Sequence, residues 1–252
     1  MKKQQKVILL GDSITQGLGS KKINFTQALQ DKLGPSFFVE NMALTGTTIL
    51  YADQILDRVV SLEPDYVIIV YGNVDAQIRP NRNGLLFPHI PGRFQKNGML
   101  MPRPFYSRTI VKKFGQNLDN WLRHFFSFLI YQVDGSEQWV SKEQFKKTYS
   151  AVVEKLLKKR SRVLACSTVY IDEALFPGSL NQYNIFNSEI ASIAHQSRCS
   201  FVDLFTPLKQ AVQKSSWEAY YNYDHFHPNS GGYELISEIL SREILQENTS
   251  RR

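Results

Sequence analysis

The hydrophobic and polar positions of this chain follow two alternating patterns. Short apolar runs such as "KVILL" and "YVIIVYG" predict β-strands, and segments with apolar residues at helical spacing lie between them. The predicted strands occupy residues 6–10, 37–41, 66–72, 162–168 and 200–205. The predicted helices lie near residues 23–33, 52–61, 142–160, 181–197 and 230–246. Strands that alternate with helices in this way are typical of βαβ units and a parallel sheet.

The runs at 66–72 and 162–168 are apolar almost throughout, as expected of central strands that are covered on both faces. We therefore predict an α/β fold of three layers, in which helices cover both sides of an open, doubly wound parallel sheet of five strands. Ligands bind such sheets at the carboxyl ends of the strands.

Segment 76–140 is longer than a single crossover helix requires. Its first part, "RPNRNGLLFPHIPGRFQKNGMLMPRPFYS", is rich in Pro, Gly, Arg and aromatic residues. We interpret 76–140 as an insertion, or lid, over the active edge of the sheet. Residues 107–131 predict a helix that is very apolar on one side, which favours a packed helix or a homo-oligomer contact over a membrane anchor.

The composition fits one compact domain over residues 1–252, because 42% of the residues are hydrophobic and no linker or internal repeat divides the chain. The first apolar run is short and has no cleavage pattern after it. The stretch 121–131 is interrupted by Arg123 and His124 and is too short to cross a bilayer. We therefore expect no membrane span and a cytoplasmic location.

The formal net charge of +7 is concentrated in the insertion, where nine basic residues between Arg79 and His124 face only Asp119. Such a patch with interleaved aromatic residues could bind nucleic acid, but the chain has no recognised nucleic-acid module, so nucleic acid is not expected as a partner. The two cysteines, Cys166 and Cys199, lie in or beside apolar runs, which favours reduced, buried thiols and no metal site.

Ser13 follows the first predicted strand in "LLGDSITQG", where a strand-to-helix turn is expected. Serine is a common N-cap residue, so a purely structural role is one interpretation. The other is a nucleophile, which requires a base within hydrogen-bond reach and a third group to orient that base.

The segment "YDHFHPNSGG" near the end of the chain offers both groups. Asp224 lies three residues before His227, close enough for the carboxylate to reach one imidazole nitrogen while the other faces outward. His225 is the rival base, but a direct neighbour of Asp224 points away from it in most turns, and we therefore favour His227.

Together, "GDSITQG" and "DHFHPN" resemble the first and last blocks of the SGNH/GDSL hydrolases, which are esterases and lipases with a flavodoxin-like fold. The resemblance implies that Ser13 is the nucleophile and the first oxyanion donor, with Asp224 and His227 completing a catalytic triad. Gly46 in "NMALTGTTI" would supply a second backbone N–H to the oxyanion. No cofactor or metal is implied.

The middle block departs from the family pattern. Family members usually read Gly-x-Asn-Asp, in which the asparagine donates a third hydrogen bond to the oxyanion, whereas here "YGNVDAQ" puts Val74 in that position and Asn73 one place early. Either Asn73 reaches the oxyanion hole, or two backbone donors suffice, or a residue such as Gln77 or Arg79 substitutes. Losing one such donor costs about 3 kcal/mol of transition-state stabilisation.

Other sequence motifs give little support for a different chemistry. The glycines near the first strand lack dinucleotide-loop spacing, no phosphate loop is present, and no further carboxylates accompany Asp12 for a phosphatase-type metal site. The arginines and aromatic residues of the insertion suggest an anionic or glycan-like ligand. We take the following as candidate substrate-binding residues: Asp12, Asp75, Gln77, Arg79 and Arg82.

The predicted function is hydrolysis of an acyl ester, with O-acetyl on a carbohydrate as the expected substrate. The insertion also resembles that of SGNH-type proteins associated with bacterial surface polysaccharides, which is consistent with that substrate. The alternatives are an O-acyltransferase acting on a glycan and, because of Val74, a family member that binds a glycan without turning it over.

Overall fold

The computed structural model describes residues 4–20, 24–96 and 98–249. Its central sheet has five parallel strands in the order β2-β1-β3-β6-β7. The strands are β1 (Gln5–Gly11), β2 (Phe37–Asn41), β3 (Tyr66–Val70), β6 (Arg162–Cys166) and β7 (Ser200–Val202). This order is that of a flavodoxin-like doubly wound sheet, so the predicted fold class is confirmed.

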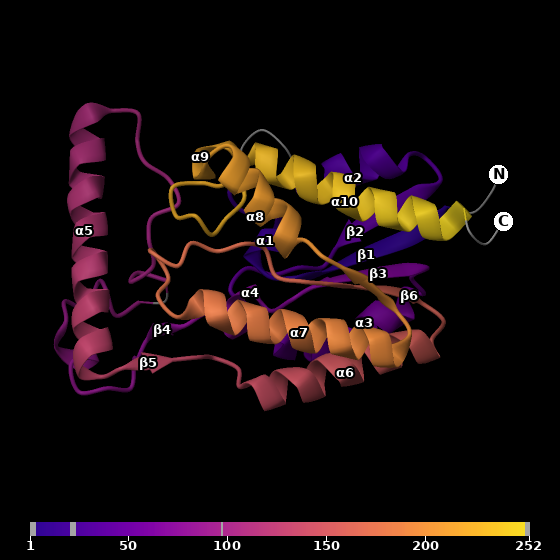
Figure 1. The fold of residues 1–252 in the computed structure, drawn as a ribbon, viewed down its shortest axis with the longest axis horizontal. Coiled ribbons are helices and arrows are strands. Elements are labelled where there is room, and N and C mark those ends of the chain that lie inside the picture. The colour runs from indigo at the N-terminus through magenta and orange to yellow at the C-terminus, as the bar shows by residue number, and fades with distance from the viewer. Residues whose placement is uncertain (1–3, 21–23, 97, 250–252) are drawn as a thin grey trace.

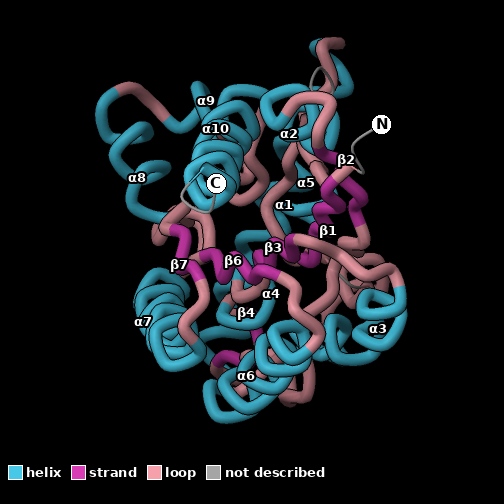
Figure 2. Tube along the Cα trace, turned by 90° about the vertical axis from the view of Figure 1, so that its right-hand side faces the viewer, coloured by secondary structure: helices cyan, strands magenta, loops and turns pink. Residues whose placement is uncertain are grey.

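Helices cover both faces of the sheet, as Figure 2 shows in a view along the strands. One layer contains α3 (Ile49–Ser61), α6 (Lys142–Lys158) and α7 (Ser179–Ser197). The other contains α2 (Phe25–Leu33), α8 (Phe205–Lys214) and α10 (Ser230–Thr249). Because both faces are covered, every residue of β3 is buried, which explains its apolar sequence.

Side chains outside the helices themselves fix several of the helix starts. Asn24 accepts hydrogen bonds from the N–H groups of the first turn of α2, and Ser141 does the same for α6. α3 begins at Ile49, three residues before the predicted start. The reason is a distant cap, because the Asp75 carboxylate accepts the Ile49 N–H at 2.8 Å.

The last strand is shorter than predicted and a helix that was not predicted follows it. β7 ends at Val202 rather than at residue 205, and α8 begins at Phe205. The Ser167 hydroxyl, at the end of the neighbouring strand β6, accepts the backbone N–H groups of Leu204 and Phe205 at 2.8 and 3.0 Å. This long-range cap starts the helix and has no local sequence signal.

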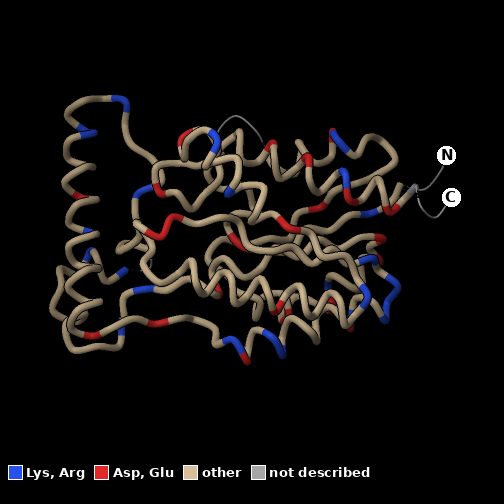
Figure 3. The backbone as a smooth tube through the Cα atoms, in the orientation of Figure 1, with Lys and Arg blue, Asp and Glu red and all other residues tan. Residues whose placement is uncertain are grey.

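The segment between β3 and α6 forms a separate layer beyond the carboxyl ends of the strands (Figure 1), and Figure 3 shows the Lys and Arg residues that this layer carries. It opens with the short helix α4 (Asn73–Ala76), and its strands β4 (Arg79–Pro80) and β5 (Ser136–Glu137) pair antiparallel. Between these strands lie the 3-10 turn η1 (Phe87–His89) and α5 (Ile110–Val133), which stands at one end of the molecule. A second apolar cluster anchors α5, and its buried members are Phe87, Ile90, Phe94 and Ile130.

Over the described ranges, no helix is both long and apolar enough to pass through a bilayer.

Gly72, at the turn between β3 and α4, is a position where the backbone excludes a side chain. Its φ of +120° is disfavoured for L-residues, and an added Cβ would lie 2.9 Å from Thr168 Cγ2. We expect Gly72→Ala to lower the free energy of unfolding by about 2–3 kcal/mol through strain and steric overlap, as measured by urea denaturation.

Gly92→Ala is the matched control. Gly92 has no positive φ, and an added Cβ there meets nothing within 4 Å, so its effect should stay within about 0.5 kcal/mol. Equal stability of the two variants would contradict the interpretation of the Gly72 turn.

Candidate active site

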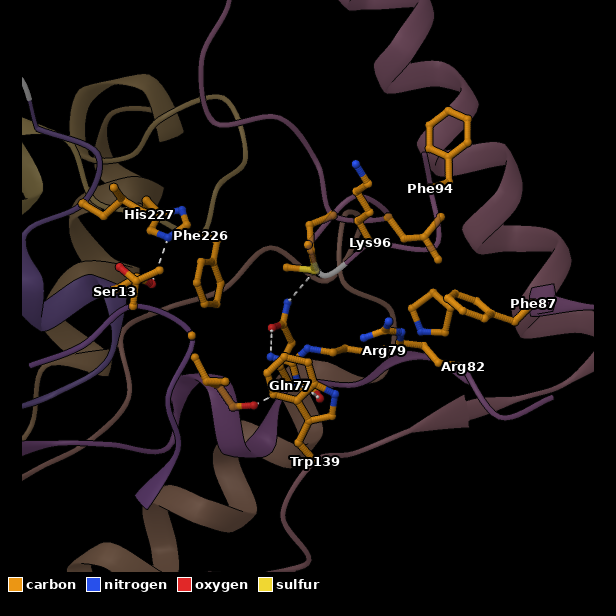
Figure 4. Close-up of a pocket in the computed structure, with 18 residues that line it drawn as sticks. Ser13, Gln77, Arg79, Arg82, Phe87, Phe94, Lys96, Trp139, Phe226 and His227 are labelled. Carbon is orange, nitrogen blue, oxygen red and sulfur yellow. Dashed lines mark hydrogen bonds between the residues drawn. The ribbon is translucent and has the colours of Figure 1, made fainter. Parts of the chain in front are cut away.

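A cavity of about 180 Å3 opens where the carboxyl ends of the strands meet the inserted layer. Ser13, Gly46 and His227 line one part of it, and insertion residues including Arg79 and Trp139 line another (Figure 4). The position agrees with the expectation that ligands bind at the carboxyl ends of parallel strands.

Ser13 lies at the start of the short helix α1 (Ser13–Gln16), directly after β1. The capping role belongs to the preceding residue, because the Asp12 carboxylate accepts the Ile14 N–H at 2.9 Å. The turn is tight, since a Cβ on Gly11 would lie 2.0 Å from Thr15 Oγ1. The Ser13 hydroxyl is therefore not needed as a cap, and the residue lines the cavity.

The structure brings Ser13, His227 and Asp224 together. His227 Nε2 lies 3.0 Å from Ser13 Oγ, and His227 Nδ1 lies 2.6 Å from Asp224 Oδ2. The other oxygen of Asp224 accepts the backbone N–H groups of Phe226 and His227, both at 3.1 Å. The carboxylate thus orients both the ring and the turn that carries it, and leaves Nε2 facing the serine.

His225 belongs to a different cluster. Its Nδ1 lies 2.6 Å from Asp172 Oδ2, and its ring stacks on Trp217 with centroids 4.7 Å apart. Its backbone has a φ of +49°, in the left-handed region, unlike the extended or right-handed backbone that most residues adopt. Asp172 and Trp217 were not candidates in the sequence, because neither lies in a motif or near His225 along the chain.

The residues expected around the oxyanion lie in different places. Gly46 lines the cavity, and its φ is +74°. Asn73 does not line it: its Oδ1 accepts the Val169 N–H at 2.9 Å, and its Nδ2 donates to Asp12 Oδ2 at 3.3 Å. Successive residues of a helical turn point in different directions, and Val74 is the one that faces the cavity.

Two expected substrate-binding residues, Asp12 and Asp75, are fully buried and lie outside the cavity lining. Asp75 accepts the N–H groups of Ile49 and Gly72, so it braces the turn at the end of β3. Burial raises the pKa of Asp12 to about 6 and that of Asp75 to about 7. Both carboxyls act within the protein scaffold and do not reach a ligand in the cavity.

The other three, Gln77, Arg79 and Arg82, do line the cavity. Arg79 is only 8% exposed, and its guanidinium donates to the carbonyls of Val74 and Gln77 and to Gln77 Oε1. It also lies over the Trp139 ring, 4.0 Å from its centroid. Burial lowers the pKa of Arg79 to about 10, which leaves it charged at neutral pH.

Arg79 forms no salt bridge with any residue that the structure describes. The Arg82 side chain donates to the Gln95 carbonyl and lies 5.2 Å from the Phe87 ring centroid. The cavity therefore has three cationic residues, Arg79, Arg82 and Lys96, beside a wall that is largely apolar. Sequence reasoning missed the apolar lining, whose members share no motif: Trp139, Phe226, Met101, Leu100 and Phe94.

Residues 9–235 match the GDSL-like lipase/acylhydrolase family. The chain belongs to this family. The GDSL-like lipase/acylhydrolases cleave acyl esters, and this protein is accordingly an ester hydrolase. No curated protein matches the chain significantly.

Solved structures of similar fold include a catalytic mutant of an acetylxylan esterase from Geobacillus stearothermophilus, with 14% identity, a TM-score of 0.63, and coverage of 97% of this chain and 95% of that one. A lipase/acylhydrolase from Enterococcus faecalis has 15% identity, a TM-score of 0.61, and coverage of 96% and 95%. A GDSL-like lipase from Bacteroides thetaiotaomicron has 13% identity, a TM-score of 0.62, and coverage of 98% and 91%. The fold is therefore shared over almost the whole length of each chain.

Within residues 4–20, 24–96 and 98–249, no group of three or more His, Cys, Asp or Glu side chains is arranged to hold a metal ion.

The raised pKa of Asp75 has a consequence for stability. Between pH 4 and 7, approximately, the folded protein binds more protons at this carboxyl than the unfolded chain, whose pKa stays near 3.8, so the free energy of unfolding falls as pH rises. Each unit of pKa difference corresponds to about 1.4 kcal/mol. We expect Asp75→Asn to be less stable at every pH, because an amide NH2 meets a backbone donor, but to lose part of this pH-dependent fall.

Urea denaturation at a series of pH values measures the slope. Asp57→Asn is the control, because Asp57 is exposed and paired with Lys155, which lowers its pKa. That variant should keep the fall. A slope in Asp75→Asn as steep as in the wild type would show that Asp75 does not titrate in this range.

Proposed function

We propose that the protein is a serine esterase that hydrolyses an acyl ester, with O-acetyl on a carbohydrate as its substrate. The observation that carries the proposal is the contact of 3.0 Å between Ser13 Oγ and His227 Nε2, with Asp224 on the other ring nitrogen. These contacts support the proposal, because nucleophilic catalysis by serine requires a base within hydrogen-bond reach and a group that orients the base.

In the proposed reaction Ser13 Oγ attacks the ester carbonyl while His227 Nε2 takes its proton. The C–O bond to the alcohol then breaks, and His227 gives the proton to the oxygen of the leaving alcohol. The acyl group remains on Ser13 as an acyl-serine. Water then attacks the acyl-serine while His227 takes one of its protons. The bond between the acyl carbon and Ser13 Oγ breaks, the acid leaves, and His227 returns the proton to Ser13 Oγ. Asp224 holds the imidazole in the tautomer that presents Nε2 to the serine and stabilises the imidazolium.

The negative charge on the carbonyl oxygen would be received by the backbone N–H groups of Ser13 and Gly46. Val74 faces the cavity where the family pattern has an asparagine, and a valine side chain cannot donate a hydrogen bond. Asn73 is held by Asp12 and Val169. The proposed site therefore works with two backbone donors, unless Gln77 or Arg79 supplies a third.

The substrate proposal has two supports. The acetylxylan esterase of similar fold acts on an acetylated polysaccharide, as its name states. In the cavity, aromatic side chains such as Phe226 and Phe87 offer surface on which a sugar ring can pack, and Arg79, which lies over Trp139, offers a positive charge without a carboxylate partner. We infer that the saccharide carries an acidic group.

A second candidate follows from Val74. A site that lacks one oxyanion donor would still bind a glycan in the cleft even if turnover were lost. A further alternative concerns the acceptor: if a sugar hydroxyl attacked the acyl-serine in place of water, the enzyme would be an O-acyltransferase. A serine-reactive fluorophosphonate separates binding from catalysis, because it labels an activated serine and leaves a pure binding protein unmarked.

We expect Ser13→Ala to abolish hydrolysis of 4-nitrophenyl acetate and labelling by the fluorophosphonate, because both reactions need the serine oxygen. The loss of rate should be at least about a thousandfold, as for other nucleophile deletions. The near-UV circular dichroism and melting temperature should match the wild type, because Asp12 retains the cap of α1.

Full activity in Ser13→Ala would refute the assignment of the nucleophile. His225→Gln is a matched control for the choice of base, since His225 contacts Asp172 and not the serine. It should keep most of the activity that His227→Gln loses. The reverse result would move the base to His225.

The acidic-saccharide proposal is tested with Arg79→Met. A charged hydrogen bond contributes about 1.5–3 kcal/mol, so the KM for an acetylated acidic oligosaccharide should rise at least tenfold, approximately, relative to wild type. Hydrolysis of a neutral acetylated oligosaccharide of the same length should change little. An equal loss on both substrates would show that Arg79 only supports the loop through Val74 and Gln77.

A further inference from the structure

The outward face of α5 carries a continuous apolar stripe. Its six members recur at alternating intervals of three and four residues, and they are 41–80% exposed. The outer stripe consists of Val111, Phe114, Leu118, Trp121, Phe125 and Phe128. Within it the rings of Trp121 and Phe125 stack with centroids 5.5 Å apart, which makes the centre of the stripe a flat aromatic surface.

The opposite face of α5 is already occupied by the body of the protein. Ile130 is fully buried in the second apolar cluster, Phe126 packs on the same cluster, and Arg123 bonds to Asp119 and to the Met101 carbonyl. Figure 1 shows α5 upright at the end of the molecule, with the other labelled helices and strands on one side of it and a loop of the inserted layer around its lower end. The outer stripe is thus not the face that anchors the helix.

The spacing of the stripe is that of a helix that packs on another helix. Apolar residues with an average period of 3.5 form the seam of a two-helix interface, with each side chain fitting between residues of the facing helix. Large apolar side chains that are this exposed and this regular mark an interaction site on a protein surface.

Charge placement favours a protein helix over a lipid surface. In a helix that lies on a membrane, Lys and Arg border the apolar face and reach the headgroups. Beyond the first turn of the helix, the positions that border the stripe carry no full charge: Gly115, Asn117, Leu122, His124, Leu129 and Tyr131. Lys112 and Arg123 lie on the opposite side of the helix, and Lys113 flanks the stripe only at its first turn.

We propose that the outer stripe binds the same stripe of a second copy of this chain, with the two α5 helices antiparallel about a two-fold axis between residues 119 and 120. This axis passes through the midpoint of the stripe, so it maps the stripe onto itself. Trp121 then faces Leu118 of the second copy, Phe125 faces Phe114, and Phe128 faces Val111. In two of these three pairs a bulky aromatic residue meets a smaller aliphatic one, which suits a closely packed seam.

A parallel pair fits less well. It would place Trp121 against Trp121 and would bring the Lys112 and Lys113 pairs of both copies to the same end. In the antiparallel pair these lysines lie roughly 20 Å apart along the axis, and the helix dipoles oppose one another.

The area is sufficient for a specific contact. Aromatic side chains bury about 150–250 Å2 each when fully covered, so the exposed parts of the four aromatic residues supply roughly 400 Å2 per copy. With Val111 and Leu118 on both copies, the total reaches the ~1,000 Å2 that a biological interface needs.

Sedimentation velocity of the full chain over a range of micromolar concentrations tests the proposal, and the expected species is a dimer. Leu118→Lys and Trp121→Glu should each sediment as monomers, because each buries two charges in the seam. Mixed in equal amounts, the two variants should form a heterodimer. In it the introduced lysine of one copy faces the introduced glutamate of the other, and the second pair in the seam is still Leu118 against Trp121. A parallel pair would not be rescued in this way.

Lys112→Glu is the matched control, since it changes charge at an exposed position of the same helix away from the stripe and should remain a dimer. Unchanged melting temperature and hydrolysis of 4-nitrophenyl acetate in the monomeric variants would show that they are folded and that the dimer is independent of the proposed reaction.

Three results would overturn the proposal. These are a monomeric wild type, a dimer that persists in Trp121→Glu, and a mixture that stays monomeric. Flotation of a monomeric wild type with phosphatidylglycerol vesicles would assign the stripe to a membrane surface instead.

Discussion

The common direction of the five strands is the constraint on which the site depends. In an all-parallel sheet every strand ends at the same edge, so the loops that follow the strands converge there although they are distant in sequence. Ser13 and His227 are 214 positions apart and meet at this edge. The antiparallel pair β4–β5 lies beyond it and brings Arg79 to the same cavity.

Behind Ser13 and His227, buried polar groups tie the strand ends to one another. Asp12 caps the turn after β1, Asn73 bonds both to Asp12 and to the backbone of Val169 after β6, and the Tyr183 hydroxyl of α7 donates to the Asn73 carbonyl at 2.7 Å. Because the amide of Asn73 is committed on both sides, this residue fixes the relative positions of three segments. The serine turn therefore rests on a polar network and not on apolar packing alone.

Much of the fold was predictable because its signals are local. Apolar runs indicated the five strands. Where Asn24 and Ser141 cap a helix, the predicted start lies within two residues of the observed one for α2 and coincides with it for α6. The starts of α3 and α8 differ because their caps, Asp75 and Ser167, come from other parts of the chain. For the site, the motifs indicated candidate residues. Tertiary packing, which a single sequence does not reveal, decides that Asp12 and Asp75 lie behind the cavity and that Trp139 lines it.

The insertion leaves and rejoins the body through β4 and β5, while the groups proposed to react are held by the sheet and the turn before α10. The wall of the cavity is thus built from two supports, the body of the domain and the inserted layer. A sequence change confined to the inserted layer would alter the wall of the cavity at Arg79 and Trp139 while leaving unchanged the elements that hold Ser13 and His227.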